Sequence, residues 1–87
     1  MAEIIEFTKN GEYEESIITL SQASVIEINR EKEGCITIYG NLEGMERARI
    51  FSILYEKNII FKIDMPECVT ITIQSESHVL DAKMIKI

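Results

Sequence analysis

Histidine and cysteine, two residue types that often act in catalysis, are few in this chain, and their spacing matches no catalytic pattern. The sequence has one histidine, His78, and two cysteines, Cys35 and Cys68. We expect His78 on an exposed first turn of a C-terminal element. Two cysteines form neither a metal motif nor a disulfide framework, so both are expected to be free thiols.

The charged residues near the centre of the sequence are expected to have structural or solvated roles. Arg47 and Arg49 fall in a helix-like segment, and Asp64 and Glu67 flank a predicted turn. An enzyme needs a nucleophile, an acid–base pair or a metal site that converge in a cleft, and no such set is recognisable. We therefore expect a protein that is not an enzyme, with no catalytic residue, no bound metal and no cofactor.

Length and charge narrow the classes of partner. The 87 residues fit one domain, and the net charge is −6, which disfavours nucleic acid and anionic membrane surfaces as partners. No apolar run approaches the roughly 20 residues that cross a bilayer. The acidic start of the chain lacks the pattern of a signal peptide, so a cytoplasmic protein is expected.

The central part of the sequence predicts one helix among three strands. Residues 44–58 place Ala48, Ile50, Phe51, Leu54 and Tyr55 on one face at helical spacing. Strand-like segments precede and follow this run, at residues 35–39, 59–64 and 68–73. Alternation in the last of them is typical of an antiparallel sheet that is covered on one face.

The flanking segments predict further strands and a C-terminal element. Residues 3–7, 16–20 and 25–28 have strand character, and Asn10-Gly11 indicates a hairpin turn. One prediction for the C-terminus is a helix from about His78. The alternation of apolar and polar residues over 84–87 allows a strand instead. We expect a single domain, with N-terminal strands in 1–30, a core in 34–75 and a C-terminal element in 76–87.

A family resemblance follows from the central motifs Ile36-Thr37-Ile38-Tyr39-Gly40, Gly44, Ala48-Arg49-Ile50-Phe51-Ser52-Ile53-Leu54 and Lys57-Asn58-Ile59. Over residues 25–75 the chain resembles an ACT domain, most of all the regulatory ACT repeats of aspartate kinases. The proline that usually stands beside the glycine is replaced by Leu42-Glu43. The resemblance implies an α+β, ferredoxin-like sandwich, with one antiparallel sheet, helices on one face and extra N-terminal strands.

The resemblance also implies a function, with one alternative. ACT domains are regulatory modules that bind a small effector, usually an amino acid, between domains or subunits. A carboxylate would use the free N–H groups at the helix start, and Glu43 would meet an ammonium group. The alternative is a structural or oligomerisation module that binds no ligand. The ligand-binding residues implied by the resemblance are Asn41, Glu43, Gly44, Met45, Asn58, Ile59 and Ile60.

The predicted α+β fold also implies a core and a contact surface. The helix is expected to place Phe51 and Leu54 against the inner face of one sheet, which carries Ile36, Ile38, Phe61, Ile63, Val69, Ile71 and Ile73. Met45, Ile53 and Ile60 point away from this core, and exposed apolar groups of this kind mark contacts. We therefore expect at least a homodimer, and a larger metabolic enzyme is a further candidate partner.

Overall fold

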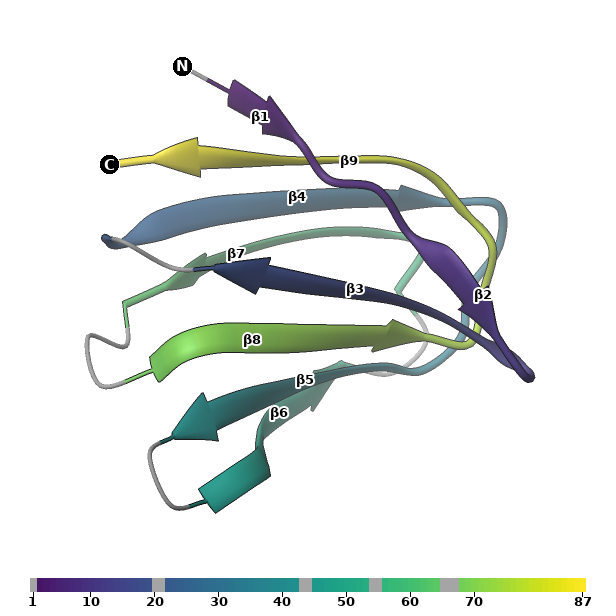
Figure 1. The fold of residues 1–87 in the computed structure, drawn as a ribbon. Coiled ribbons are helices and arrows are strands. Elements are labelled where there is room, and N and C mark those ends of the chain that lie inside the picture. The colour runs from purple at the N-terminus through teal and green to yellow at the C-terminus, as the bar shows by residue number, and fades with distance from the viewer. Residues whose placement is uncertain (1, 20–21, 43–44, 54–55, 65–67) are drawn as a thin grey trace.

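Two antiparallel sheets stack face to face in this protein as a β-sandwich (Figure 1). The computed structural model describes residues 2–19, 22–42, 45–53, 56–64 and 68–87, with the backbone alone for 41–42, 45–53 and 68–69. Sheet A has the strand order β1 (Ala2–Ile4), β9 (Val79–Lys86), β4 (Ser24–Arg30) and β7 (Asn58–Ile63). Sheet B has the order β2 (Thr8–Asn10), β3 (Tyr13–Thr19), β8 (Cys68–Ser75), β5 (Ile36–Leu42) and β6 (Met45–Ile53).

The predicted α+β, ferredoxin-like fold is wrong, because the described residues contain no helix. Residues 45–53, expected in a helix over 44–58, form strand β6, whose backbone pairs Ile53 with Ile36 and Phe51 with Ile38 of β5. Met, Glu, Arg and Ala favour helices, but such propensities are weak and tertiary context overrides them. Here β6 pairs with the backbone groups of β5 on the side away from β8. No helix long and apolar enough to span a membrane occurs among the described residues.

Isoleucine alternation builds a single core between the sheets. Ile26 and Ile28 of β4 and Ile71 and Ile73 of β8 face each other's sheet with no exposed surface. The residues between them, Glu27 and Thr72, lie on the outer faces, where Glu27 is half-buried and Thr72 is buried. The other buried apolar side chains are Ile5, Ile18, Ile36, Ile38, Ile59, Ile63, Ala82 and Met84.

Much of the predicted core is confirmed, although its arrangement on one sheet is wrong. Five of the expected residues are buried, namely Ile36, Ile38, Ile63, Ile71 and Ile73, and Phe61 is half-buried. Phe61 and Ile63 belong to sheet A and the others to sheet B. The side chains of Phe51, Leu54 and Val69 lie outside the described residues.

The terminal segments are partly as predicted. The Asn10-Gly11 hairpin is confirmed, since Asn10 pairs with Tyr13 and Gly11 has a φ of 65°. Glycine adopts this left-handed conformation without a side-chain clash. The helix expected from His78 is wrong: the segment forms strand β9, as its alternation allowed, and fills a central place in sheet A.

The two cysteines lie at opposite ends of one strand pair. Cys35 precedes β5 and its carbonyl oxygen accepts a hydrogen bond from the N–H of Glu76, whereas Cys68 pairs with Leu42 at the far end. At about 3.3 Å per residue, the two Cα atoms are roughly 20 Å apart. A disulfide between them within one chain is therefore excluded.

The assigned core predicts a position-dependent loss of stability. Ile71 is fully buried in the middle strand of sheet B, whereas Ile17 on neighbouring β3 is 71% exposed. Ile71→Ala should lower the free energy of unfolding by about 2–5 kcal/mol, and the control Ile17→Ala by no more than about 0.5 kcal/mol. Urea denaturation measures both, and equal losses in the two variants would contradict this core.

Candidate functional site

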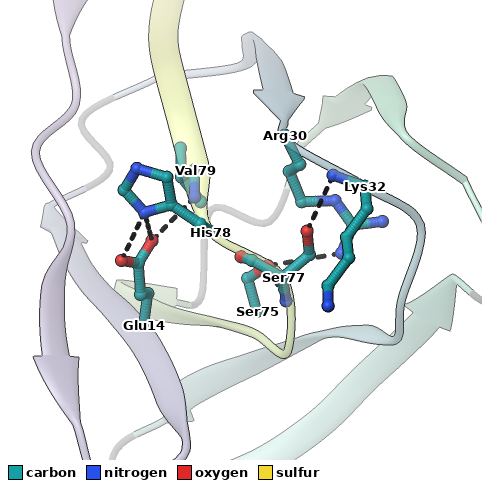
Figure 2. Close-up of polar contacts among 7 residues, drawn as sticks. All are labelled: Glu14, Arg30, Lys32, Ser75, Ser77, His78 and Val79. Atoms are coloured by element: carbon teal, nitrogen blue, oxygen red, sulfur yellow. Dashed lines mark hydrogen bonds and ion pairs between the residues drawn. The ribbon is translucent and has the colours of Figure 1, made fainter.

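One end of the sandwich holds three of the buried polar side chains among the described residues, Arg30, Ser75 and Ser77. Strands β4 and β8 end there and β5, β7 and β9 begin there (Figure 1). Arg30 is the last residue of β4, on the inward side of the alternation, and its side chain has no exposed surface. Figure 2 shows Arg30 beside Ser75 and Ser77, with His78 and Glu14 on the other side of the β8–β9 turn.

The Arg30 guanidinium is held by neutral acceptors. Nη2 donates to the carbonyl oxygens of Gly34, at 2.8 Å, and Glu56, and Nη1 donates to Ser75 Oγ at 3.3 Å and Cys35 O at 3.4 Å. Burial lowers the pKa of Arg30, and the charges of Cys35 and Glu76 oppose this effect. Arginine stays protonated in proteins, so a cation is buried here. Its bonds join the β4–β5 connection, the segment before β7 and the end of β8.

Two buried serines complete this end of the sandwich. The Ser75 hydroxyl donates to Ser77 O at 2.8 Å and accepts from Ser77 N at 3.2 Å, and Ser77 Oγ accepts from Lys32 N at 3.1 Å. Both hydroxyl groups are therefore used in closing the β8–β9 turn and fixing the residues after β4. These contacts are structural, since they leave neither serine positioned as a nucleophile.

A carboxylate–imidazole pair connects the two sheets beside this cluster. The Oε2 atom of Glu14, in β3, lies 2.9 Å from Nδ1 of His78. The Oε1 atom of Glu14 accepts a hydrogen bond from the backbone N–H of Val79 at 2.7 Å. The hydrogen bond and charge of Glu14 raise the pKa of His78. Burial raises the pKa of Glu14, but hydrogen bonds from Val79 and His78 outweigh it, so this pKa lies below its usual range.

A cleft of about 370 Å³ adjoins this pair, between the segment from β1 to β2 and the start of β9. Its walls include Glu6, Phe7, Glu14, His78 and Asp81. Two of the three carboxylates already accept hydrogen bonds, Glu14 as described and Asp81 from Asn29 at 2.7 Å. Among the described residues, no three His, Cys, Asp or Glu side chains are grouped for a metal ion.

The structure does not bring the described members of the predicted ligand-binding set together within one chain. Glu43 and Gly44 lie outside the described residues, and Asn41 and Met45 are placed in β5 and β6 of sheet B. Asn58, Ile59 and Ile60 begin β7 in sheet A at the opposite end of the sandwich. The helix start that was to bind a carboxylate is absent from the described residues, because β6 begins at Met45.

The second group of predicted residues lies instead on an open sheet edge, Asn58–Asp64, which we name the β7 edge. Within the described residues β7 pairs with β4 alone. Arg30 N donates to Lys57 O at 3.1 Å, so by alternation Ile59, Phe61 and Ile63 direct their backbone groups at β4. The N–H and C=O groups of Asn58, Ile60 and Lys62 therefore point away from the sheet. Ile60 is 67% exposed and borders a shallow hollow of about 200 Å³ with Glu27 and Asn29.

Sequence reasoning missed Arg30, Glu14 and the two serines. A signal existed for Arg30, because it continues the inward positions Ile26 and Ile28 at strand spacing. Glu14 and His78 are 64 residues apart in sequence, so their pairing follows only from the contact between the sheets.

Comparison of the chain with models of protein families, with curated proteins and with solved structures finds no match. The resemblance to ACT domains thus has no independent test from relatives, and the fold that it implied differs from the one observed.

The Glu14–His78 pair predicts a measurable shift of one titration. His78 is the only histidine, so its ring protons can be followed by NMR without assignment. We expect a pKa above the ordinary 6.5, returning towards that value in Glu14→Gln because the hydrogen bond and charge are lost. Glu15→Gln, the neighbouring substitution, should leave the titration unchanged. An unaltered titration in Glu14→Gln would disprove the pairing.

The pH dependence of stability follows from the same two shifts. A raised pKa of His78 gives a contribution that is complete below about pH 6.5 and is lost as the pH rises through the raised value. A lowered pKa of Glu14 gives a contribution that is complete above about pH 4.5 and is lost as the pH falls through the lowered value. The difference in stability between the parent and Glu14→Gln should therefore be greatest between roughly pH 4.5 and 6.5.

Removing the Arg30 side chain should destabilise the fold strongly. Arg30→Ala removes the donor to the carbonyl oxygens of Gly34 and Glu56 and to the hydroxyl of Ser75. A hydrogen bond from a charged group contributes about 1.5–3 kcal/mol. We expect a loss of about 3 kcal/mol or more in urea denaturation. Arg30→Lys keeps the charge without the planar fork and should fall between the parent and Arg30→Ala. A loss below about 1 kcal/mol in Arg30→Ala would contradict the stabilising role of the hydrogen bonds that Arg30 donates.

Proposed function

We propose that this chain is a non-catalytic assembly module that associates with other copies through the β7 edge. The observation that carries the proposal is the outward direction of the backbone groups of Asn58, Ile60 and Lys62 on a strand that has one neighbour in the described part of the chain. Such an edge is a template for pairing with another chain. The exposed Ile60, which lies between Asn58 and Lys62 on the outer face of the strand, adds apolar area to that pairing.

The polar clusters favour assembly over catalysis. Arg30, Ser75 and Ser77 are buried and bonded to neighbouring backbone, and Glu14 and His78 hold β3 to β9. These contacts are those of a structural framework. Catalysis would instead need groups left available to a substrate in a cleft.

Amino-acid sensing, the function implied by the resemblance to ACT domains, stays a prediction with less support. Its physical basis was a helix start beside Glu43 that would bind a carboxylate, and strand β6 occupies this part of the sequence from Met45 onwards. The expected dimer rested in part on the helix, which was to expose Met45 and Ile53, and these residues lie in strand β6. Its predicted contact at Ile60 remains exposed and on an edge in the sandwich.

Light scattering at micromolar concentration tests the proposal. The parent should give at least twice the chain mass of 10.0 kDa, and Ile60→Lys should shift the mass towards one chain because the lysines at positions 60 and 62 of the two copies would repel one another across the contact. Ile17→Lys introduces the same charge at a position that is 71% exposed in sheet B, and should keep the parent's mass.

A proline variant separates backbone pairing from side-chain contact. Ile60 directs its N–H away from β4, so Ile60→Pro removes a donor that the β4–β7 ladder does not use, and proline is tolerated at such edge positions. We expect this variant to fold and to lose association. A parent that stays at one chain mass at every concentration tested would overturn the proposed function.

A further inference from the structure

We infer that two copies join antiparallel across a two-fold axis at Phe61, which makes one continuous sheet from both copies of sheet A. This inference rests on the proposed function and adds the register. A two-fold axis is the commonest symmetry of soluble oligomers and presents the same strand from both sides. The candidate strand is long enough for this, because β7 spans Asn58–Ile63 and the exposed Asp64 follows it.

The direction of the backbone groups restricts the possible registers. Asn58, Ile60 and Lys62 point to the open edge, and Asp64 is the next position of the same alternation. In an antiparallel pair, outward-pointing residues must face outward-pointing residues so that each pair exchanges both N–H···O bonds. A two-fold axis that passes through a residue keeps this parity, whereas an axis between two residues breaks it. Axes at Asn58 and Ile59 would carry the pairing onto Glu56, whose carbonyl oxygen already accepts from Arg30, so the remaining choices are Ile60, Phe61, Lys62 and Ile63.

The axis at Phe61 joins complementary side chains. It sets Asn58 opposite the partner's Asp64 and Ile60 opposite the partner's Lys62, each pair occurring twice by symmetry. On the inner face it sets Phe61, which is half-buried, against its own copy. An aromatic side chain can then pack against an equivalent ring next to the existing core.

Charge also favours the axis at Phe61. Glu27 is the neighbour of Ile60 on β4, so the partner's Lys62 would lie in the same row as Glu27 with Ile60 between them. The lysine stem can cover Ile60 while its ammonium group reaches towards the carboxylate. Glu27 has a partner in Lys83 at 3.7 Å and its side chain remains 34% exposed, which leaves room for a second cation.

The other axes are less favourable. An axis at Lys62 sets two lysines directly opposite each other, and like charges there are destabilising. An axis at Ile60 omits the pair between Asn58 and Asp64. An axis at Ile63 sets Lys62 opposite Asp64 but carries the pairing on to Pro66, which has no N–H group.

Disulfide trapping tests this register. Two single-cysteine chains, Ile60→Cys and Lys62→Cys, are prepared with Cys35 and Cys68 replaced by serine, mixed under reducing conditions and then oxidised. In the inferred register residue 60 faces residue 62 of the other copy at a Cα distance of about 5.5 Å, which a disulfide can bridge. Residues of equal number lie diagonally at about 7–8 Å and should not link. We expect the mixed dimer alone on non-reducing gels.

The other outcomes overturn the register or the whole proposal in distinguishable ways. Dimers of Ile60→Cys by itself would place the axis at Ile60, and dimers of Lys62→Cys by itself would place it at Lys62. An absence of any cross-link, with light scattering still giving twice the chain mass under reducing conditions, would overturn the register and leave the proposed function standing. A single chain mass for the reduced mixture and for the parent would overturn both.

Discussion

The buried guanidinium of Arg30 is the interaction on which the end of this sandwich depends. A cation without exposed surface must be compensated, and here carbonyl and hydroxyl oxygens from three connections supply the acceptors. One side chain thus ties together the β4–β5 connection, the segment before β7 and the end of β8.

The contacts of Arg30 fix one end of the sandwich but do not cover the edges of its sheets. Sheet order places β7 at one margin of sheet A, and a sheet that does not close into a barrel must protect its margins or use them. Lys62 is the sort of residue that discourages uncontrolled pairing. The same lysine opposes pairing in one register through repulsion and favours another through Glu27, so protection and specific association are compatible in one short strand.

The strand content could be read from the sequence because burial of isoleucine at alternate positions is a local signal. It located β3, β4, β5, β7 and β8 to within a few residues. It could not assign strands to sheets, since Ile63 and Ile71 have the same pattern but face each other from opposite layers. The helix prediction for residues 45–53 was wrong for a related reason. Apolar residues at helical spacing and the strand-forming segment Ile50-Phe51-Ser52-Ile53 occur together there, and pairing with β5 decides between helix and strand.

The features of the candidate site also differ in whether a local sequence pattern predicts them. Contacts between residues distant in sequence, such as Glu14 with His78, have no local signature and depend on how the sheets stack. Exposure of Ile60, in contrast, follows from local alternation with Ile59 and Phe61, whichever fold surrounds the strand. That is why an expectation of association at Ile60 can outlast the ferredoxin-like fold from which it was first argued, whereas a ligand site that needed a helix start cannot.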